Sequence, residues 1–185
     1  MVLNKKTKLT GNADERVLQI LRMAGWYEDR HIGISQVEHY YKEQRVPLVD
    51  ATKSFFEEYH GIADSWFLSY DPVPGRVLSP DFHFDLYPSS MLDDVSEHVF
   101  DGEYPNLSQE QLTIDAAANE AATHVGEIGY YYPARVWIGE SGKFYTLHEY
   151  DHGQVHVFCT LMEFLKQELE QCHCDHATVL LLRKI

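Results

Sequence analysis

The sequence predicts an α+β fold with N-terminal helices, a central mostly antiparallel β-sheet, and a C-terminal helix followed by a closing strand. The first sixty residues contain three segments in which apolar residues recur at helical spacing. After Gly61 the pattern changes to the alternation that is typical of strands, and helical spacing returns near the C-terminus. Helices that precede a block of strands are typical of the α+β class.

The length of 185 residues suits one domain, so we expect residues 1–185 to fold together. The sequence leaves open whether residues 1–12 are flexible. It has no apolar run of signal-peptide or transmembrane length, and its three cysteines are too few for a disulfide framework. These features predict a cytoplasmic location.

The first helix is expected to begin after Asn12, because Glu15 stands three residues later and completes a capping box. The apolar residues of this helix share one face: Val17, Ile20, Leu21 and Ala24. Gly25 is a natural helix stop, since it adopts the left-handed conformation without a Cβ penalty. In such a Schellman ending, Trp26 and Leu21 are the two residues that touch.

Arg30 follows this ending, and we expect its guanidinium to hold the loop through backbone carbonyls or a carboxylate. Gly25, Trp26 and Arg30 are therefore interpreted as structural residues. If the indole of Trp26 is fully buried, its truncation to alanine costs about 3–5 kcal/mol.

The second helix is predicted from Ser35, with Glu38 completing a capping box, to about Gln44, ahead of Pro47. The third is predicted over residues 51–60, with Asp50 as its cap. Gly61 is the expected stop of this third helix and is also interpreted as structural.

Strands are predicted over residues 65–71 and 76–87, where apolar residues alternate with His83 and Asp85. Residues 134–150 are predicted to form a hairpin whose turn contains Gly142, a structural glycine in the left-handed conformation.

Helical spacing returns over residues 90–100, a segment that carries Asp93, Asp94 and Glu97. Residues 108–124 fit either an alanine-rich helix or a loop with a short helix. Residues 155–169 are predicted to form an amphipathic helix in which Cys159 is a small buried apolar residue. Residues 177–184 are predicted to form the closing strand.

The net charge of −14 is concentrated in the middle of the chain. Residues 50–151 contain 19 acidic residues and four basic ones, and residues 77–134 contain no Lys or Arg. Such a field disfavours nucleic acids and anionic membranes and favours a basic partner or a metal ion. Solubility alone is an equally good explanation.

The motif search gives one metal candidate and no enzyme signature. Cys172, His173, Cys174 and His176 are ligand types that bind zinc, although one crowded cluster is poor spacing for a tetrahedral site. A polar turn between helix and strand explains the cluster equally well. A small metal-binding protein or metal-dependent enzyme is therefore the alternative function.

Three consecutive tyrosines, Tyr130, Tyr131 and Tyr132, precede Pro133. Core packing is the favoured interpretation. The functional alternative is an interface anchor, because tyrosine supplies contact area at a small entropic cost.

The order of these motifs resembles the third subgroup of the SUKH superfamily of bacterial immunity proteins. The resemblance is carried by Gly25-Trp26 with Arg30, by Phe55-Phe56 leading into residues 59–66, by residues 82–85, and by the hairpin segment 126–149. It extends over residues 14–170.

The resemblance implies an α+β immunity protein, not an enzyme, that binds and neutralises a cognate polymorphic toxin and needs no cofactor. Many such toxins are nucleases, whose phosphate-binding groove is basic, so an acidic surface is the expected contact. The resemblance assigns no contact residue. From the charge pattern, the candidates for toxin contact are Asp81, Asp85, Asp93, Asp94, Glu97, Asp101, Glu103 and Tyr104.

Overall fold

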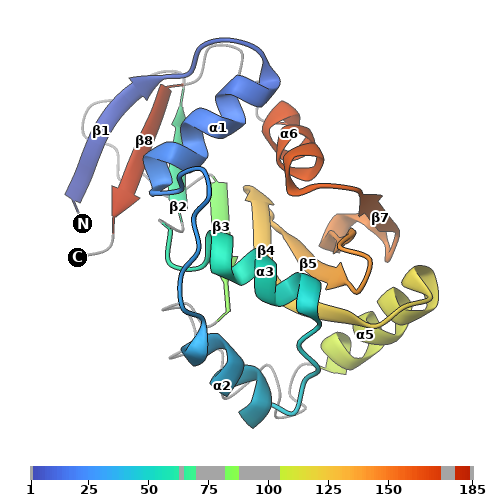
Figure 1. Cartoon of the computed structure of the whole chain (residues 1–185). Coiled ribbons are helices and arrows are strands. Elements are labelled where there is room, and N and C mark those ends of the chain that lie inside the picture. Colours follow the sequence, from blue (N-terminus) through green and yellow to red (C-terminus); the bar gives the residue numbers. More distant parts are fainter. Residues whose placement is uncertain (1, 63–64, 70–81, 88–104, 172–177, 184–185) are drawn as a thin grey trace.

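The computed structural model describes residues 2–62, 65–69, 82–87, 105–171 and 178–183 and confirms the α+β class (Figure 1). The helices are α1 (Ala13–Ala24), α2 (Ser35–Glu43), α3 (Asp50–Tyr59), α5 (Pro105–Ala118), α6 (Leu161–Gln171) and the short 3-10 helix η1 (Glu149–Asp151). The strands are β1 (Val2–Lys8), β2 (Ser65–Ser69), β3 (Phe82–Leu86), β4 (Ala122–Tyr130), β5 (Ala134–Gly139), β6 (Phe144–Leu147), β7 (Val155–Phe158) and β8 (Thr178–Arg183).

These strands form one sheet in the order β1-β8-β2-β3-β4-β5-β6-β7, and all the described pairings are antiparallel. The closing strand β8 lies between β1 and β2, where Val2 is opposite Arg183 and Ser65 is opposite Leu182. The sequence left open whether residues 1–12 are flexible. In the structure, residues 2–8 of this segment form β1, which pairs with the C-terminal strand β8.

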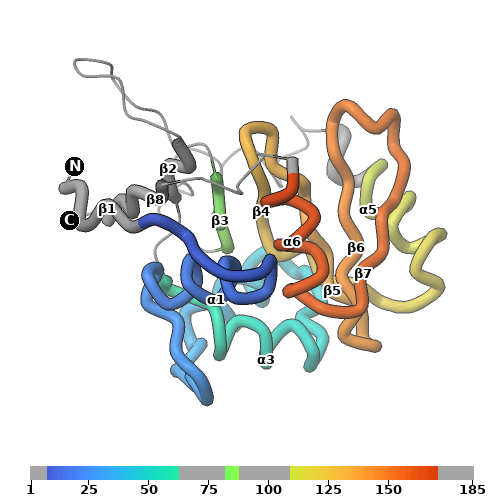
Figure 2. The backbone as a smooth tube through the Cα atoms, turned by 90° about the horizontal axis from the view of Figure 1, so that it is seen from above, coloured from blue at the N-terminus to red at the C-terminus, as the bar shows by residue number. Residues whose placement is uncertain are grey.

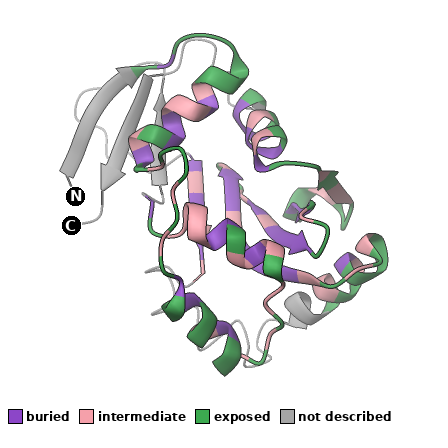
Figure 3. Cartoon of the chain, viewed as in Figure 1, coloured by how far each residue is buried: buried purple, intermediate pink, exposed green. Residues whose placement is uncertain are grey.

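The sheet has a main core on one face and a smaller core on the other, because neighbouring strand residues point to opposite sides. Helices α1 and α3 lie across the main face (Figures 1 and 2), and buried residues concentrate on β3, β4 and β5 (Figure 3). In β3 the predicted alternation is confirmed, with Phe82, Phe84 and Leu86 buried in this core. On the opposite face, Ile114 of α5 packs with Trp137, Tyr145 and Leu147.

Both predicted ends of α1 are confirmed. The Asn12 side chain accepts from the Glu15 N–H at 3.0 Å, and the Asn12 N–H donates to the Glu15 carboxylate at 2.8 Å. Gly25 has a φ of 108°, and the Trp26 N–H donates to the Leu21 carbonyl at 2.9 Å, which defines the Schellman ending.

Arg30 connects the loop after α1 to the end of α3. Its guanidinium donates to the carbonyl of Glu58 at 2.5 Å and to that of His60 at 2.6 Å, as the sequence predicted for carbonyl acceptors. The partly buried Trp26 donates from Nε1 to the Glu58 carboxylate at 2.9 Å. Gly61 follows with a φ of 75°, so these residues form one structural joint.

The predicted caps of α2 and α3 are wrong by one residue. Ile34 and Val49 occupy the N-cap positions, and neither makes a side-chain capping bond, while Ser35 and Asp50 are already helical. Tertiary contacts fix these starts instead, since Ile34 is buried and the Val49 N–H donates to the Thr123 hydroxyl at 3.2 Å.

Residues 108–124 contain the end of helix α5 and the first residues of β4, a strand that the sequence pattern did not predict. The hairpin of β5 and β6 is confirmed, and Gly142 has the expected positive φ of 80°. Residues 76–81 and 90–100 lie outside the described residues.

The amphipathic helix predicted over residues 155–169 is wrong in its first part. Its start pairs with β6 as strand β7, and α6 begins only at Leu161. The Glu163 carboxylate accepts from the Cys159 N–H at 2.9 Å, and the Thr160 hydroxyl accepts from the Glu163 N–H at 3.2 Å, which caps the helix at this point. Cys159 is consequently exposed in the connection, not buried. Among the described helices, none has the length and apolar character needed to cross a membrane.

Candidate partner-binding surface

Four residues form a row across the sheet on the α5 face. Asp85 of β3 lies opposite Glu127 of β4, Glu127 lies opposite Arg135 of β5, and Arg135 lies opposite Leu147 of β6. Directly opposed residues of antiparallel strands place their side chains in contact range. The sheet therefore gathers carboxylates that are distant in sequence around one guanidinium.

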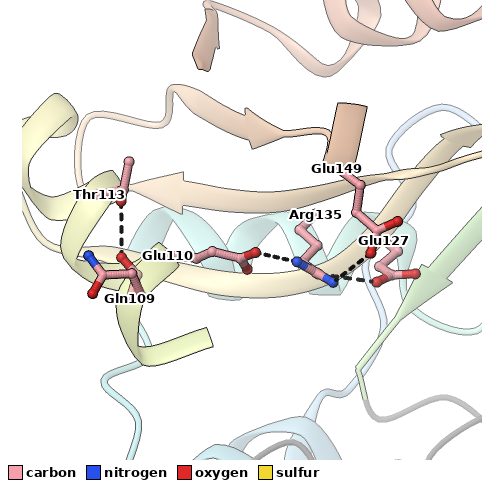
Figure 4. A network of polar contacts seen from close by, with 6 residues as sticks. All are labelled: Gln109, Glu110, Thr113, Glu127, Arg135 and Glu149. Carbon is pink, nitrogen blue, oxygen red and sulfur yellow. Dashed lines mark hydrogen bonds and ion pairs between the residues drawn. The ribbon is translucent and has the colours of Figure 1, made fainter. Parts of the chain in front are cut away.

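Arg135 pairs with three carboxylates (Figure 4). Its Nη1 donates to Glu110 of α5, its Nε lies 3.6 Å from Glu127, and its Nη2 lies 3.7 Å from Glu149. Three carboxylates against one guanidinium leave two negative charges when all are ionised. The Glu149 side chain is 77% exposed, so this excess charge is open to solvent.

Burial raises the pKa of Glu110 above its ordinary value and outweighs the opposing effect of Arg135. Burial also raises the pKa of Glu127. Arg135 lowers this pKa, the negative charge of Asp85 raises it, and the net effect is an increase. In both residues the ionised form is stabilised less than in water. A further positive charge at this position would therefore favour the ionised carboxylates.

An open pocket of about 140 Å³ connects this charged group to the turn between β4 and β5. Its lining residues are Glu127, Tyr132, Pro133, Arg135, Leu147 and Glu149.

The turn itself presents two aromatic rings to solvent. Tyr131 and Tyr132 are 62% and 59% exposed, with ring centroids 4.8 Å apart, so core packing is wrong for these two residues. Tyr130 alone is partly buried against the main core. The Tyr132 N–H donates to the Tyr130 carbonyl at 2.6 Å, and Tyr131 has a φ of 57°. A left-handed tyrosine is uncommon and costs conformational energy.

Helix α6 holds this turn from beneath through Glu168, which is fully buried. The Glu168 carboxylate accepts from the Tyr130 N–H at 3.3 Å and lies 3.2 Å from Nε2 of the buried His148. The ring of Tyr150, 49% exposed, stacks on His148 at 4.8 Å. A third exposed tyrosine is thus anchored to the same buried pair.

Burial lowers the pKa of His148, but the hydrogen bond and charge of Glu168 and the charge of Asp151 outweigh it. The net effect raises the pKa of His148 above its ordinary value. The protein therefore favours the imidazolium and its ion pair with Glu168 beneath the turn.

Of the eight predicted contact residues, the structure describes Asp85 alone. Its side chain is 11% exposed and lies 3.6 Å from His83 Nδ1, beside the carboxylates that surround Arg135. The others fall outside the described residues: Asp81, Asp93, Asp94, Glu97, Asp101, Glu103 and Tyr104. The 172–176 cluster also lies outside them, and the described part of the chain contains no group of three metal-ligating side chains.

The sequence pattern did not single out Glu110, Glu127 and Glu149, and it used Arg135 only as a boundary of the stretch without basic residues. One signal was available. Glu127 and Arg135 are each four residues from Tyr131, a spacing that pairs them in a hairpin with the tyrosines at its turn. This spacing is informative only if residues 122–130 are recognised as a strand, which the sequence pattern did not indicate.

Comparison with known proteins gives the family. The sequence model of the SUKH-3 immunity protein family matches residues 13–166, which is most of the chain. The chain belongs to the SUKH-3 family of immunity proteins, as its resemblance to the third SUKH subgroup predicted. Comparisons with curated proteins and with solved structures gave no match.

Proposed function

We propose that this protein neutralises a cognate polymorphic toxin by binding to the toxin domain, without catalysing a reaction and without a cofactor. The observation that carries the proposal is the match of the SUKH-3 immunity family over residues 13–166. Immunity function implies a toxin partner, and the cell that makes the toxin needs the protein in its cytoplasm.

We also propose that the toxin is basic and acts as a nuclease. Support comes from the net charge of −14 and from residues 77–134, which contain no Lys or Arg. Opposite fields speed the association of two proteins and favour occupation of a phosphate-binding groove. The same field repels nucleic acids and anionic membranes, which are therefore not proposed as partners.

The test of immunity uses the cognate toxin, which we expect the gene directly upstream to encode. Bacteria that express its toxin domain should stop growing, and co-expression of this protein should restore growth. Purified together, the two proteins should elute as one complex. Growth arrest that persists at full expression of the protein would contradict the proposal.

The acidic contact has its own test. The proposed contact residues remain Asp81, Asp85, Asp93, Asp94, Glu97, Asp101, Glu103 and Tyr104. Replacing Asp93, Asp94 and Glu97 together by Lys should weaken protection at moderate salt. Undiminished protection would exclude this acidic stretch as the contact.

Metal analysis of the purified protein decides the alternative function. If the protein acts by binding a toxin, we expect no bound zinc after dialysis. Stoichiometric zinc that is lost in a Cys172→Ser, Cys174→Ser variant would instead support a metal-binding protein.

A further inference from the structure

We propose that the toxin docks on the turn between β4 and β5 and inserts a lysine or arginine side chain into the adjoining pocket beside Arg135. This inference rests on the proposed function and adds a second part to the contact surface, beside the acidic residues proposed above. Tyr131 and Tyr132 supply the apolar contact. Glu127 and Glu149 form ion pairs with the basic side chain of the toxin.

The tyrosines have the character of interface anchors. Two adjacent rings that are 62% and 59% exposed contribute nothing to the core, yet Tyr131 keeps a left-handed φ of 57°. Backbone strain of this kind persists at positions where the conformation serves binding. Tyrosine is also among the residues that dominate the binding energy of protein interfaces.

The pocket suits a basic side chain because two carboxylates, Glu127 and Glu149, line it beside one guanidinium, which is also paired with Glu110. The Glu149 side chain is 77% exposed, and its carboxylate lies 3.7 Å from the Arg135 guanidinium, which is longer than a hydrogen bond. This weak pair leaves the carboxylate open to a second cation. Tyr132 lines the same pocket and is 59% exposed, and tyrosine is a residue type that binds cations through its ring. Charge and ring thus specify a cationic side chain.

The surface is also fixed before binding. Glu168 accepts from the Tyr130 N–H and pairs with His148, and His148 stacks on Tyr150. A turn held from beneath loses little conformational freedom on association, which favours affinity.

The test measures the dissociation constant for the toxin domain encoded by the upstream gene, by calorimetry, for three variants. Tyr131→Asn removes the ring while asparagine tolerates the left-handed backbone. Tyr132→Ala removes the second ring, and Glu149→Lys reverses the exposed charge. The matched controls are Tyr27→Ala, a tyrosine of similar exposure (56%), and Glu38→Lys, an exposed carboxylate of α2.

We expect each tyrosine variant to raise the dissociation constant about 30-fold, the effect of losing a binding hot spot. Glu149→Lys should raise it at least about tenfold, and the controls should stay within about twofold. The urea midpoint of Tyr131→Asn should equal or exceed that of the wild type, which separates lost contact from lost folding.

Wild-type binding that all three variants retain would overturn this inference and leave the proposed function intact. A wild-type protein that does not bind the toxin would overturn both.

Discussion

Arg30 stabilises the protein through two carbonyls at the end of α3, where the helix itself supplies no donors. Arg30→Lys retains the charge but cannot present two guanidinium N–H groups in the same fork. We predict that it lowers the free energy of unfolding by about 1–2 kcal/mol, measured by urea denaturation.

The control is Arg22→Lys at the exposed last turn of α1, which should change stability by less than about 0.5 kcal/mol. Equal stability of Arg30→Lys and wild type would show that the two carbonyl bonds contribute nothing.

Trp26 is only partly buried, so the cost expected for a fully buried indole is too high. We predict that Trp26→Ala lowers the free energy of unfolding by about 2–3 kcal/mol, below the range for complete burial. Toxin affinity at a temperature where the variant is folded should match the wild type. A stable variant with lost affinity would move the binding surface to this joint.

His124 makes stability depend on pH. Burial, with the charge of Arg135, lowers its pKa to about 3. As pH decreases below about 6.5, His124 takes up a proton in the unfolded chain but stays neutral in the folded chain. The free energy of unfolding therefore falls as pH decreases below about 6.5. The loss from this group approaches about 1.4 kcal/mol per pH unit.

His124→Phe keeps a ring between Tyr87 and Trp137. We predict that it reduces the slope of the unfolding free energy against pH by the amount that corresponds to one bound proton. Urea denaturation of both proteins at pH 7, 6 and 5 measures the difference, because the carboxylates common to both cancel. Parallel curves would contradict a neutral buried His124.

At the scale of elements, β4 depends on a glycine at its irregular position. The register with β5 shifts between His124 and Gly126, where Gly126 has a φ of 136°. A Cβ at this residue would lie 2.0 Å from the Asp85 carbonyl oxygen. We predict that Gly126→Ala lowers the free energy of unfolding by about 2–4 kcal/mol.

Gly142→Ala is the matched control, since φ is also positive but nothing lies within 4 Å of the added Cβ. It should cost only the backbone strain of about 1 kcal/mol. Similar losses for the two variants in thermal or urea unfolding would exclude the steric cause.

Elements whose ends are set locally were predictable from sequence. The capping box of Asn12 and the Gly25 ending fixed α1 to the residue, because every contact involved lies within a few positions. The starts of α2 and α3 depend on tertiary packing and were wrong by one. β4 was missed because its glycines and its alanine-rich approach have low strand propensity, and antiparallel partners on both sides compensate for that.

For the candidate surface, the sequence predicted only the sign of its charge. Composition placed the negative charge in the middle of the chain, and Asp85 lies beside the Arg135 group. The group itself combines residues of α5, the two strands β4 and β5, and η1, which no local sequence pattern relates. The exposure of Tyr131 follows from its left-handed turn, a conformation that tyrosine seldom adopts.

At the scale of the whole molecule, β1 and β8 place both ends of the chain in the same sheet, which supports our proposal of one domain over residues 1–185. The dominant property at this scale is the net charge of −14. If the toxin is basic, long-range attraction should govern how fast the two proteins meet.

We predict that the association rate constant for the toxin domain falls at least about tenfold between 50 and 500 mM salt, because screening shortens the reach of the field. The dissociation rate constant should change far less. Stopped-flow or surface-plasmon measurements of both rates provide the check, and an association rate independent of salt would contradict electrostatic steering.

The central claim, neutralisation by binding alone, is tested most directly by titrating a fixed concentration of the active toxin domain with this protein. Binding predicts that toxin activity falls linearly and reaches its minimum at a fixed stoichiometric ratio, and that intact toxin recovered from the complex is active again. Complete inactivation by a small fraction of one equivalent, or a covalently altered toxin after separation, would contradict it.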